Sequence, residues 1–249
     1  MRVVSLCPST TETVAALGKA EALVGITRFC IHPAAIVERI PKVGGTKDPD
    51  QARIEALAPD LILMNREENR QEDHAALSQR LPQARIDVTH PTGVAEVPEL
   101  LLHFGRLLGA EPEAEAAAEA LRAALLELDA SVKARPRLRA AYLIWKKPWM
   151  AVGGGTYVDA LLCRAGLDNV FREAPVPYPE ISLEALVATA PELILLPDEP
   201  FPFDARHAAE LSAALPRASI QLVSGDDCCW HGTRSIRGVA LMQELRATR

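Results

Sequence analysis

Residues 3–18 read VVSLCPSTTETVAALG, a short apolar run followed by a helix-forming segment. The run VVSL is rich in β-branched residues and has the length of a buried strand. Ser9 and Glu12 stand three residues apart, which is the spacing of a capping box and predicts Ser9 as the helix N-cap. Gly18 is the expected C-terminal glycine of that helix. The segment therefore predicts a strand, a turn and a helix, the repeating unit of α/β proteins.

Strands and helices continue to alternate through both halves of the chain. Further strands are predicted at 23–26, 60–65, 84–88, 138–145, 192–197 and 219–223. Helices are predicted at 53–59, 68–81, 94–109, 156–167, 182–191, 205–215 and 234–247. This alternation is typical of parallel sheets wrapped by helices.

Residues 111–135, EPEAEAAAEALRAALLELDASVKAR, interrupt the alternation with one long helix. They contain no glycine, and no proline after Pro112. The segments before and after it are alike: RIEALAPDLILM at 53–64 and SLEALVATAPELILL at 182–196 share a short helix, a proline and an apolar strand. The predicted fold is α/β, with two Rossmann-like lobes (1–110 and 136–249) joined by a connecting helix at 111–135.

Net charge, apolar runs, the first residues and the cysteines limit the function classes and the cellular locations that the sequence allows. The 249 residues carry a net charge of −6, which disfavours nucleic-acid binding. No apolar run approaches the roughly 18 residues of a membrane span, so no membrane insertion is expected. The first residues do not resemble a secretory leader, which predicts a cytoplasmic protein. The alternative is a periplasmic or extracellular protein whose leader was trimmed. The five cysteines lack a C-x-x-C pair and are expected to be reduced thiols.

The order of the segments resembles substrate-binding proteins of the helical-backbone class, closest to the vitamin B12 and iron-chelate binders of ABC importers. The resemblance is carried by SLCPSTTE, RIEALAPDLIL, GGGTYVDALLCRAGLDNVF and PYPEISLEALVATAPELILL. It implies a ligand cleft between two lobes, and binding rather than catalysis. The ligand would be cobalamin or another metal chelate, with no obligatory cofactor.

The resemblance also implies a partner, the membrane subunit of an ABC transporter. In such proteins a surface glutamate on each lobe docks an arginine of that subunit. The second-lobe position matches Glu184, whereas the first-lobe position falls on Ala52. One docking charge is therefore expected to be lost.

Candidate ligand residues of the first lobe follow its strands. Cys30 and His32 come after the strand at 23–26 and are donors suited to zinc, iron or cobalt. The alternative is a buried thiol beside a histidine that the backbone satisfies. Glu67 and Glu68 follow the strand at 60–65 and are expected either to contact a polar ligand or to form a solvated helix start.

Candidates in the second lobe are mainly aromatic. Trp145, Trp149 and Tyr157 surround the glycines at 153–155, where flat rings would suit a corrin or porphyrin; the alternative is ordinary packing. By resemblance, Tyr178 occupies a position that contacts the ligand. The last candidates follow the strand at 219–223 and offer a stacking face, a metal donor and an anion-binding guanidinium: Trp230, His231 and Arg234.

Three functions are compared on these residues. The first is a soluble binding protein for a corrinoid. The second is a binder of a metal ion or another chelate (iron-siderophore, haem or zinc) through Cys30, His32 and His231. The third is an enzyme with Cys7 or Cys30 as nucleophile and a histidine as base, which no catalytic motif supports.

Overall fold

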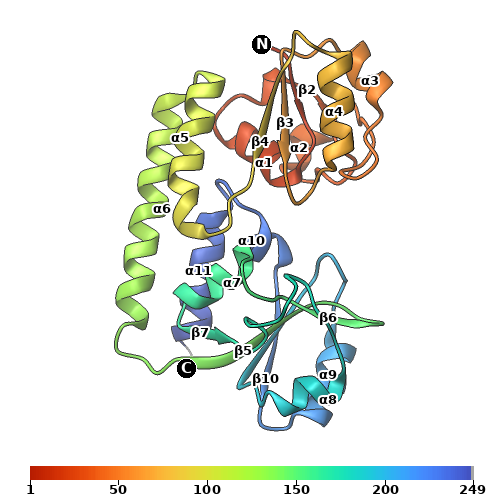
Figure 1. Ribbon diagram of the computed structural model, residues 1–249. Helices are drawn as coiled ribbons and strands as arrows, with labels where there is room; N and C mark the ends of the chain where they lie inside the picture. Colours follow the sequence, from red (N-terminus) through yellow and green to blue (C-terminus); the bar gives the residue numbers. More distant parts are fainter. Residues whose placement is uncertain (248–249) are drawn as a thin grey trace. The chain divides into compact units, whose positions relative to one another are not determined.

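The computed structural model describes residues 1–247, which form two compact α/β units (Figure 1). Unit 1 comprises Met1–Pro91, Val97–Glu119 and His231–Arg234. Unit 2 comprises Thr92–Glu96, Ala120–Trp230 and the segment from Ser235. The predicted fold class is confirmed, but the units are not divided at 110 and 136. The long helix α6 (Glu111–Val132) begins in unit 1 and ends in unit 2.

Unit 1 is built on a fully parallel sheet with the strand order β2-β1-β3-β4. The strands are β1 (Val3–Ser5), β2 (Leu23–Ile26), β3 (Leu61–Asn65) and β4 (Arg85–Thr89). Alternate residues of β3 point to opposite faces: Leu61 and Leu63 pack with Phe104, and Ile62 and Met64 pack with Leu77. The sheet is therefore buried on both faces, as parallel sheets require.

The helices of unit 1 are α1 (Pro8–Ala16), α2 (Ala34–Val37), α3 (Gln51–Ala56), α4 (Gln71–Arg80), α5 (Val97–Leu108) and the first part of α6. The predicted N-cap at Ser9 is wrong. Helix α1 begins at Pro8 with Cys7 as N-cap, and no side chain caps it. Proline has no N–H and a fixed φ, so it suits the first helical position. The helix therefore starts at Pro8, before the predicted N-cap Ser9.

Unit 2 combines a parallel sheet with a short antiparallel extension. Its strands are β5 (Leu138–Trp145), β6 (Trp149–Ala151), β7 (Leu167–Asn169), β8 (Glu180–Ile181), β9 (Leu193–Pro197) and β10 (Ser219–Val223). The order is β10-β9-β5-β6-β8, with β7 also paired to β5. Only β6 and β8 run antiparallel to their neighbours. The sequence did not predict β6, β7 and β8, which have two or three residues each.

The helices of unit 2 are α7 (Tyr157–Arg164), α8 (Leu183–Ala188), α9 (Ala205–Ala214), α10 (Gly225–Cys229) and α11 (Ser235–Ala247). Leu186 of α8 and Leu211 of α9 pack on Ile194 and Leu196 of β9, so these helices cover one face of the sheet (Figure 1). The short helix α10 contacts both α7 and α11. None of the described helices is long and apolar enough to cross a bilayer.

Candidate functional site

Loops at the carboxyl ends of β1 and β3 are tied together by Asn69 in unit 1. Its Nδ2 donates to the carbonyls of Leu6 and Thr46, at 3.0 Å each. Its Oδ1 accepts from the Asn65 N–H at 2.8 Å. An Asn so close after an apolar strand is a typical loop-fixing residue. This amide holds the edge of the sheet where a ligand of an open α/β sheet binds.

Glu67 and Glu68 lie at this edge, as their position after β3 predicted. The Asn65 Oδ1 accepts from the N–H groups of both, which forms the turn that presents them. Glu67 is exposed, and one of its carboxylate oxygens lies 4.0 Å from His90 Nε2. Burial raises the pKa of Glu68, an effect that the nearby Lys47 partly offsets. Glu68 therefore becomes neutral more readily than an ordinary glutamate.

His231 lies against α1 within unit 1. Its Nε2 is 3.3 Å from the Ser9 hydroxyl, which in turn is 3.2 Å from the Cys7 thiol. Burial, with a smaller contribution from His90, lowers the pKa of His231 to about 4. Burial also raises the pKa of the Cys7 thiol to about 11. At neutral pH the imidazole is therefore neutral, the form that donates to a metal centre.

Arg234 directs its guanidinium at Glu12 of α1. Two hydrogen bonds join them, from Nε and Nη2 to the two carboxylate oxygens, both at 2.6 Å. The Arg234 side chain is only 4% exposed. Arg234 and Glu12 thus form a bidentate ion pair, which holds the segment 231–234 against α1. The predicted contact with a ligand anion finds no support in this geometry.

Cys30 points into the core of unit 1, which agrees with the alternative of a buried thiol. It is 2% exposed, and its sulfur lies 3.1 Å from Thr11 Oγ1 and 3.2 Å from Thr27 Oγ1. Within residues 1–247, no three His, Cys, Asp or Glu side chains are placed to hold a metal ion. The predicted three-donor site of Cys30, His32 and His231 is therefore not formed, because the thiol packs among apolar side chains of the core.

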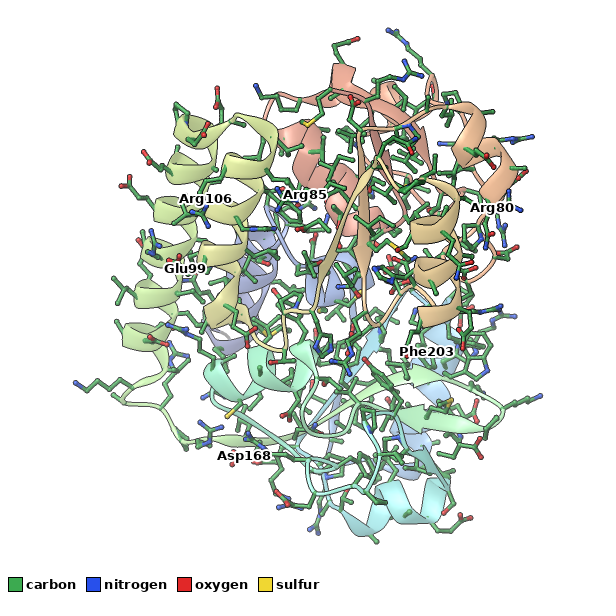
Figure 2. The ribbon with its side chains drawn as sticks, turned by 45° about the horizontal axis from the view of Figure 1, so that its top comes forward. Arg80, Arg85, Glu99, Arg106, Asp168 and Phe203 are labelled. Carbon is green, nitrogen blue, oxygen red and sulfur yellow. The ribbon has the colours of Figure 1, made fainter. Side chains whose placement is uncertain are left out.

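The carboxyl ends of β5 and β9 carry an aromatic cluster in unit 2. Trp145 lies edge-on to Phe201 with ring centroids 5.4 Å apart, and Trp149 stacks on Phe203 at 6.1 Å (Phe203 is labelled in Figure 2). His207 contacts both phenylalanines edge-on. Trp145 remains 41% exposed, so part of its side chain is open to a ligand. The sequence pattern did not predict Phe201 and Phe203 as site residues, although FPF at 201–203 follows the β9 region.

The other aromatic candidates do not join this cluster. Tyr157 is 5% exposed and its hydroxyl lies 2.7 Å from Ser235 Oγ, so packing against α11 is its role here. Trp230 is 6% exposed and donates its indole N–H to Glu199 Oε1 at 2.7 Å. Tyr178 is 38% exposed. The sequence grouped Trp145, Trp149 and Tyr157, but only the two tryptophans share a surface, because Tyr157 points inward from the first turn of α7.

Known proteins resemble this chain in sequence and in fold. Residues 3–209 match the family described as "Periplasmic binding protein". The vitamin B12-binding protein of Yersinia pestis (strain Pestoides F) is 30% identical over 200 residues, which cover 78% of this chain and 69% of that protein.

Solved structures agree in fold. The periplasmic vitamin B12 binding protein BtuF of Vibrio cholerae superposes with a TM-score of 0.84 at 21% identity, covering 100% of this chain and 98% of that one. A periplasmic heme binding protein from Pseudomonas aeruginosa gives a TM-score of 0.81 at 25% identity, covering 98% and 91%. At 21% identity the first likeness concerns the fold alone.

Proposed function

Because the chain belongs to the periplasmic binding protein family, we propose that its ligand is a corrinoid of the cobalamin type. One observation carries the proposal: the vitamin B12-binding protein that is 30% identical across 78% of this chain. The aromatic cluster of unit 2 supports it, since the partly exposed Trp145 is a side chain on which a broad macrocycle can stack. The acids at the edge of unit 1 add polar groups that suit the amide side chains of a corrin.

A second candidate ligand is haem or another metal chelate. The heme binding protein from Pseudomonas aeruginosa, 25% identical to this chain, favours it. A histidine donor would not distinguish the two ligands, because cobalt and iron each accept an axial nitrogen. A bare metal ion is not proposed, since that ligand would need several converging protein donors.

Titration of the reduced, metal-free protein with hydroxocobalamin tests the proposal. We expect one-to-one binding at micromolar or lower Kd in a calorimeter. Trp145→Ala should weaken binding by about tenfold, as expected for losing a stacked ring. Leu126→Ala is the matched control, because Leu126 is equally apolar and 67% exposed on α6. Absence of heat with hydroxocobalamin but binding of haemin would favour the second candidate.

We further propose that the protein binds without catalysis. The enzyme hypothesis needs a thiolate at Cys7 or Cys30. Burial raises the pKa of both thiols, to about 11 for Cys7. Neither sulfur is then a ready nucleophile at neutral pH. Resistance of both thiols to iodoacetamide in the native protein is the expected result, and rapid alkylation of either would contradict it.

The proposed partner is the membrane subunit of an ABC transporter. Glu184 lies exposed in the first turn of α8, where hydrogen bonds from its own backbone N–H and from Ser182 lower the pKa of its carboxyl. Ala52 on α3 is exposed and offers no charge. Glu184→Lys should weaken binding to proteoliposomes that carry a vitamin B12 importer, and Ala52→Glu should strengthen it. If neither variant changes binding, these positions do not dock the transporter.

The cytoplasm is the proposed location. All five cysteines are free thiols, including the neighbours Cys228 and Cys229 in α10, and a reducing compartment keeps thiols in this state. Fractionation of cells that produce the protein at natural levels tests the location. Recovery with the periplasmic fraction would contradict it and would match the compartment in which the related proteins work.

A further inference from the structure

A carboxyl group in the loop after β9 reaches the C-terminal end of α10 within unit 2. Glu199 lies two residues beyond β9 and is half-buried. Its Oε1 accepts a hydrogen bond from the indole N–H of Trp230 at 2.7 Å, and the Cys229 sulfur lies 3.6 Å from the same oxygen. Glu199 therefore holds both the last residue of α10 and the residue that follows the helix.

The same loop packs tightly against the first turn of α10. A Cβ built at Gly225 would lie 2.7 Å from the Glu199 carbonyl oxygen and 2.8 Å from the Glu199 Cγ. The Gly225 N–H donates to Asp198 Oδ1 at 2.7 Å. The loop thus contacts α10 at both ends, and any side chain at position 225 would collide with the loop.

Within residues 1–247, the groups that face the Glu199 carboxyl are acidic or uncharged, and no salt bridge neutralises it. On α10 these groups are the Cys229 thiol and the carboxyl of Asp226, which hydrogen-bonds to Glu199. On β5 the group is the Tyr142 phenol. Burial raises the pKa of the Cys229 thiol and of the Tyr142 phenol, so both are neutral at neutral pH. Asp226 is therefore the charge that Glu199 meets.

These surroundings make Glu199 a group whose charge changes near neutral pH. Burial, with a smaller contribution from the Asp226 charge, raises the pKa of Glu199 to about 7. Below that pH, the pair holds one proton, which forms a hydrogen bond between the two carboxyl groups. Above that pH, two carboxylates repel each other in a partly buried place. The contact between Glu199 and Asp226 is therefore favourable at pH 6 and unfavourable at pH 8.

We propose that Glu199 and Asp226 form a pH-sensitive latch, which holds the first turn of α10 on the loop after β9 while the pair carries its proton and releases this turn when the proton leaves. The hydrogen bond from Trp230 is kept, because an indole N–H donates well to a carboxylate. The release therefore starts at Gly225 and Asp226. Since α10 has only five residues, separation of its first turn opens most of the helix. Trp230 is the last residue before the unit 1 segment His231–Arg234, so the latch controls how firmly the chain is held where it leaves unit 2.

Amide hydrogen exchange of the ligand-free protein at pH 6 and pH 8 tests the latch. The Cys228 N–H donates to the Ser224 carbonyl and the Trp230 N–H donates to the Asp226 carbonyl, so both amides report the state of α10. Their protection factors, corrected for the intrinsic effect of pH on exchange, should fall by about tenfold between pH 6 and pH 8, because the released state gives up the proton of the pair. Unchanged protection would overturn the proposal.

The central strand β9 shows whether the opening is local. It pairs with β10 on one side and β5 on the other, so its amides exchange only when the sheet opens. At pH 8, the protection factors of the two α10 amides should be at least about tenfold below those of β9. Equal protection in α10 and β9 would show that the helix opens only with the whole sheet, which contradicts a latch.

Variants locate the latch. Glu199→Gln removes the charge and keeps the size of the side chain, so α10 should keep at pH 8 the protection that the wild-type protein has at pH 6. Asp226→Asn removes the repulsion, so the fall in protection should shrink to about twofold. Glu210→Gln is the matched control and should keep the wild-type fall, because Glu210 is an exposed carboxylate of unit 2 paired with Lys146. A wild-type fall that persists in Glu199→Gln, or that all three variants lose alike, would overturn the proposal. No ligand is added, so the outcome is independent of hydroxocobalamin binding.

Discussion

His231 shows how a single buried side chain makes stability depend on pH. Its pKa is about 4 in the native protein, against 6.5 for an ordinary histidine, mainly because of burial. Between pH 4 and pH 6.5, His231 is protonated in the unfolded chain but stays neutral in the native protein. The stabilisation is thus complete above pH 6.5 and is lost as the pH falls toward 4. The full difference amounts to about 3 kcal/mol of unfolding free energy.

Urea unfolding at pH 7 and at pH 4.5 measures this contribution. Between pH 7 and pH 4.5, the unfolding free energy of the wild-type protein should fall by about 2–3 kcal/mol more than that of His231→Gln. The variant keeps a polar group near Ser9 but cannot be protonated in this range, so the comparison removes the effects of other acids. Equal losses in the two proteins would mean that His231 is protonated without cost in the native state.

At the scale of secondary-structure elements, the contact between α5 and α6 depends on one glycine. A Cβ built at Gly105 would lie 2.5 Å from the Cβ of Ala114 and 3.3 Å from the Ala110 carbonyl oxygen. The two helices therefore approach more closely than any side chain at 105 would allow. This approach also explains why Ala114, in the unit 1 part of α6, is completely buried.

Gly105→Ala should destabilise the protein by about 1–2 kcal/mol. Overpacking costs roughly 1–3 kcal/mol, and the better helix propensity of alanine returns about 1 kcal/mol. In the double variant Gly105→Ala with Ala114→Gly, the clash is relieved, so the two changes should be less harmful together than their sum. A double-mutant cycle by urea unfolding measures this coupling. Strict additivity would contradict the predicted clash.

Across the whole molecule, sequence patterns predict the long elements better than the side-chain directions. The strands at 23–26, 60–65 and 219–223 are found because apolar runs have a clear period, and β6 to β8 are missed because two or three residues have none. The pattern places Glu67, Glu68 and Trp145 at strand ends correctly. It cannot show that Cys30 and Tyr157 point inward, because that depends on contacts with Thr11 and Ser235, far away in sequence.

The path of the chain also decides whether a part of it can fold alone. The sequence predicts a first lobe at 1–110, but unit 1 also uses Val97–Glu119 and His231–Arg234. A fragment of residues 1–110 would leave Glu12 without Arg234 and would lose the buried Ala114 and Ala118. Removing one partner of a buried ion pair alone costs about 3–5 kcal/mol, a large part of the usual 5–15 kcal/mol of a domain.

We therefore expect the 1–110 fragment to show no cooperative urea transition by circular dichroism. In the intact chain, Arg234→Ala should lower the unfolding free energy by about 3–5 kcal/mol, because it leaves the Glu12 carboxylate, which is only 17% exposed, without its partner. Glu12→Leu with Arg234→Met should recover most of that loss, since no charge is then buried alone. A 1–110 fragment that unfolds cooperatively, with the stability of the intact chain, would show that the short return at 231–234 adds nothing to unit 1. The double variant separates the effect of the charge from that of packing, because it restores apolar volume without restoring the ion pair.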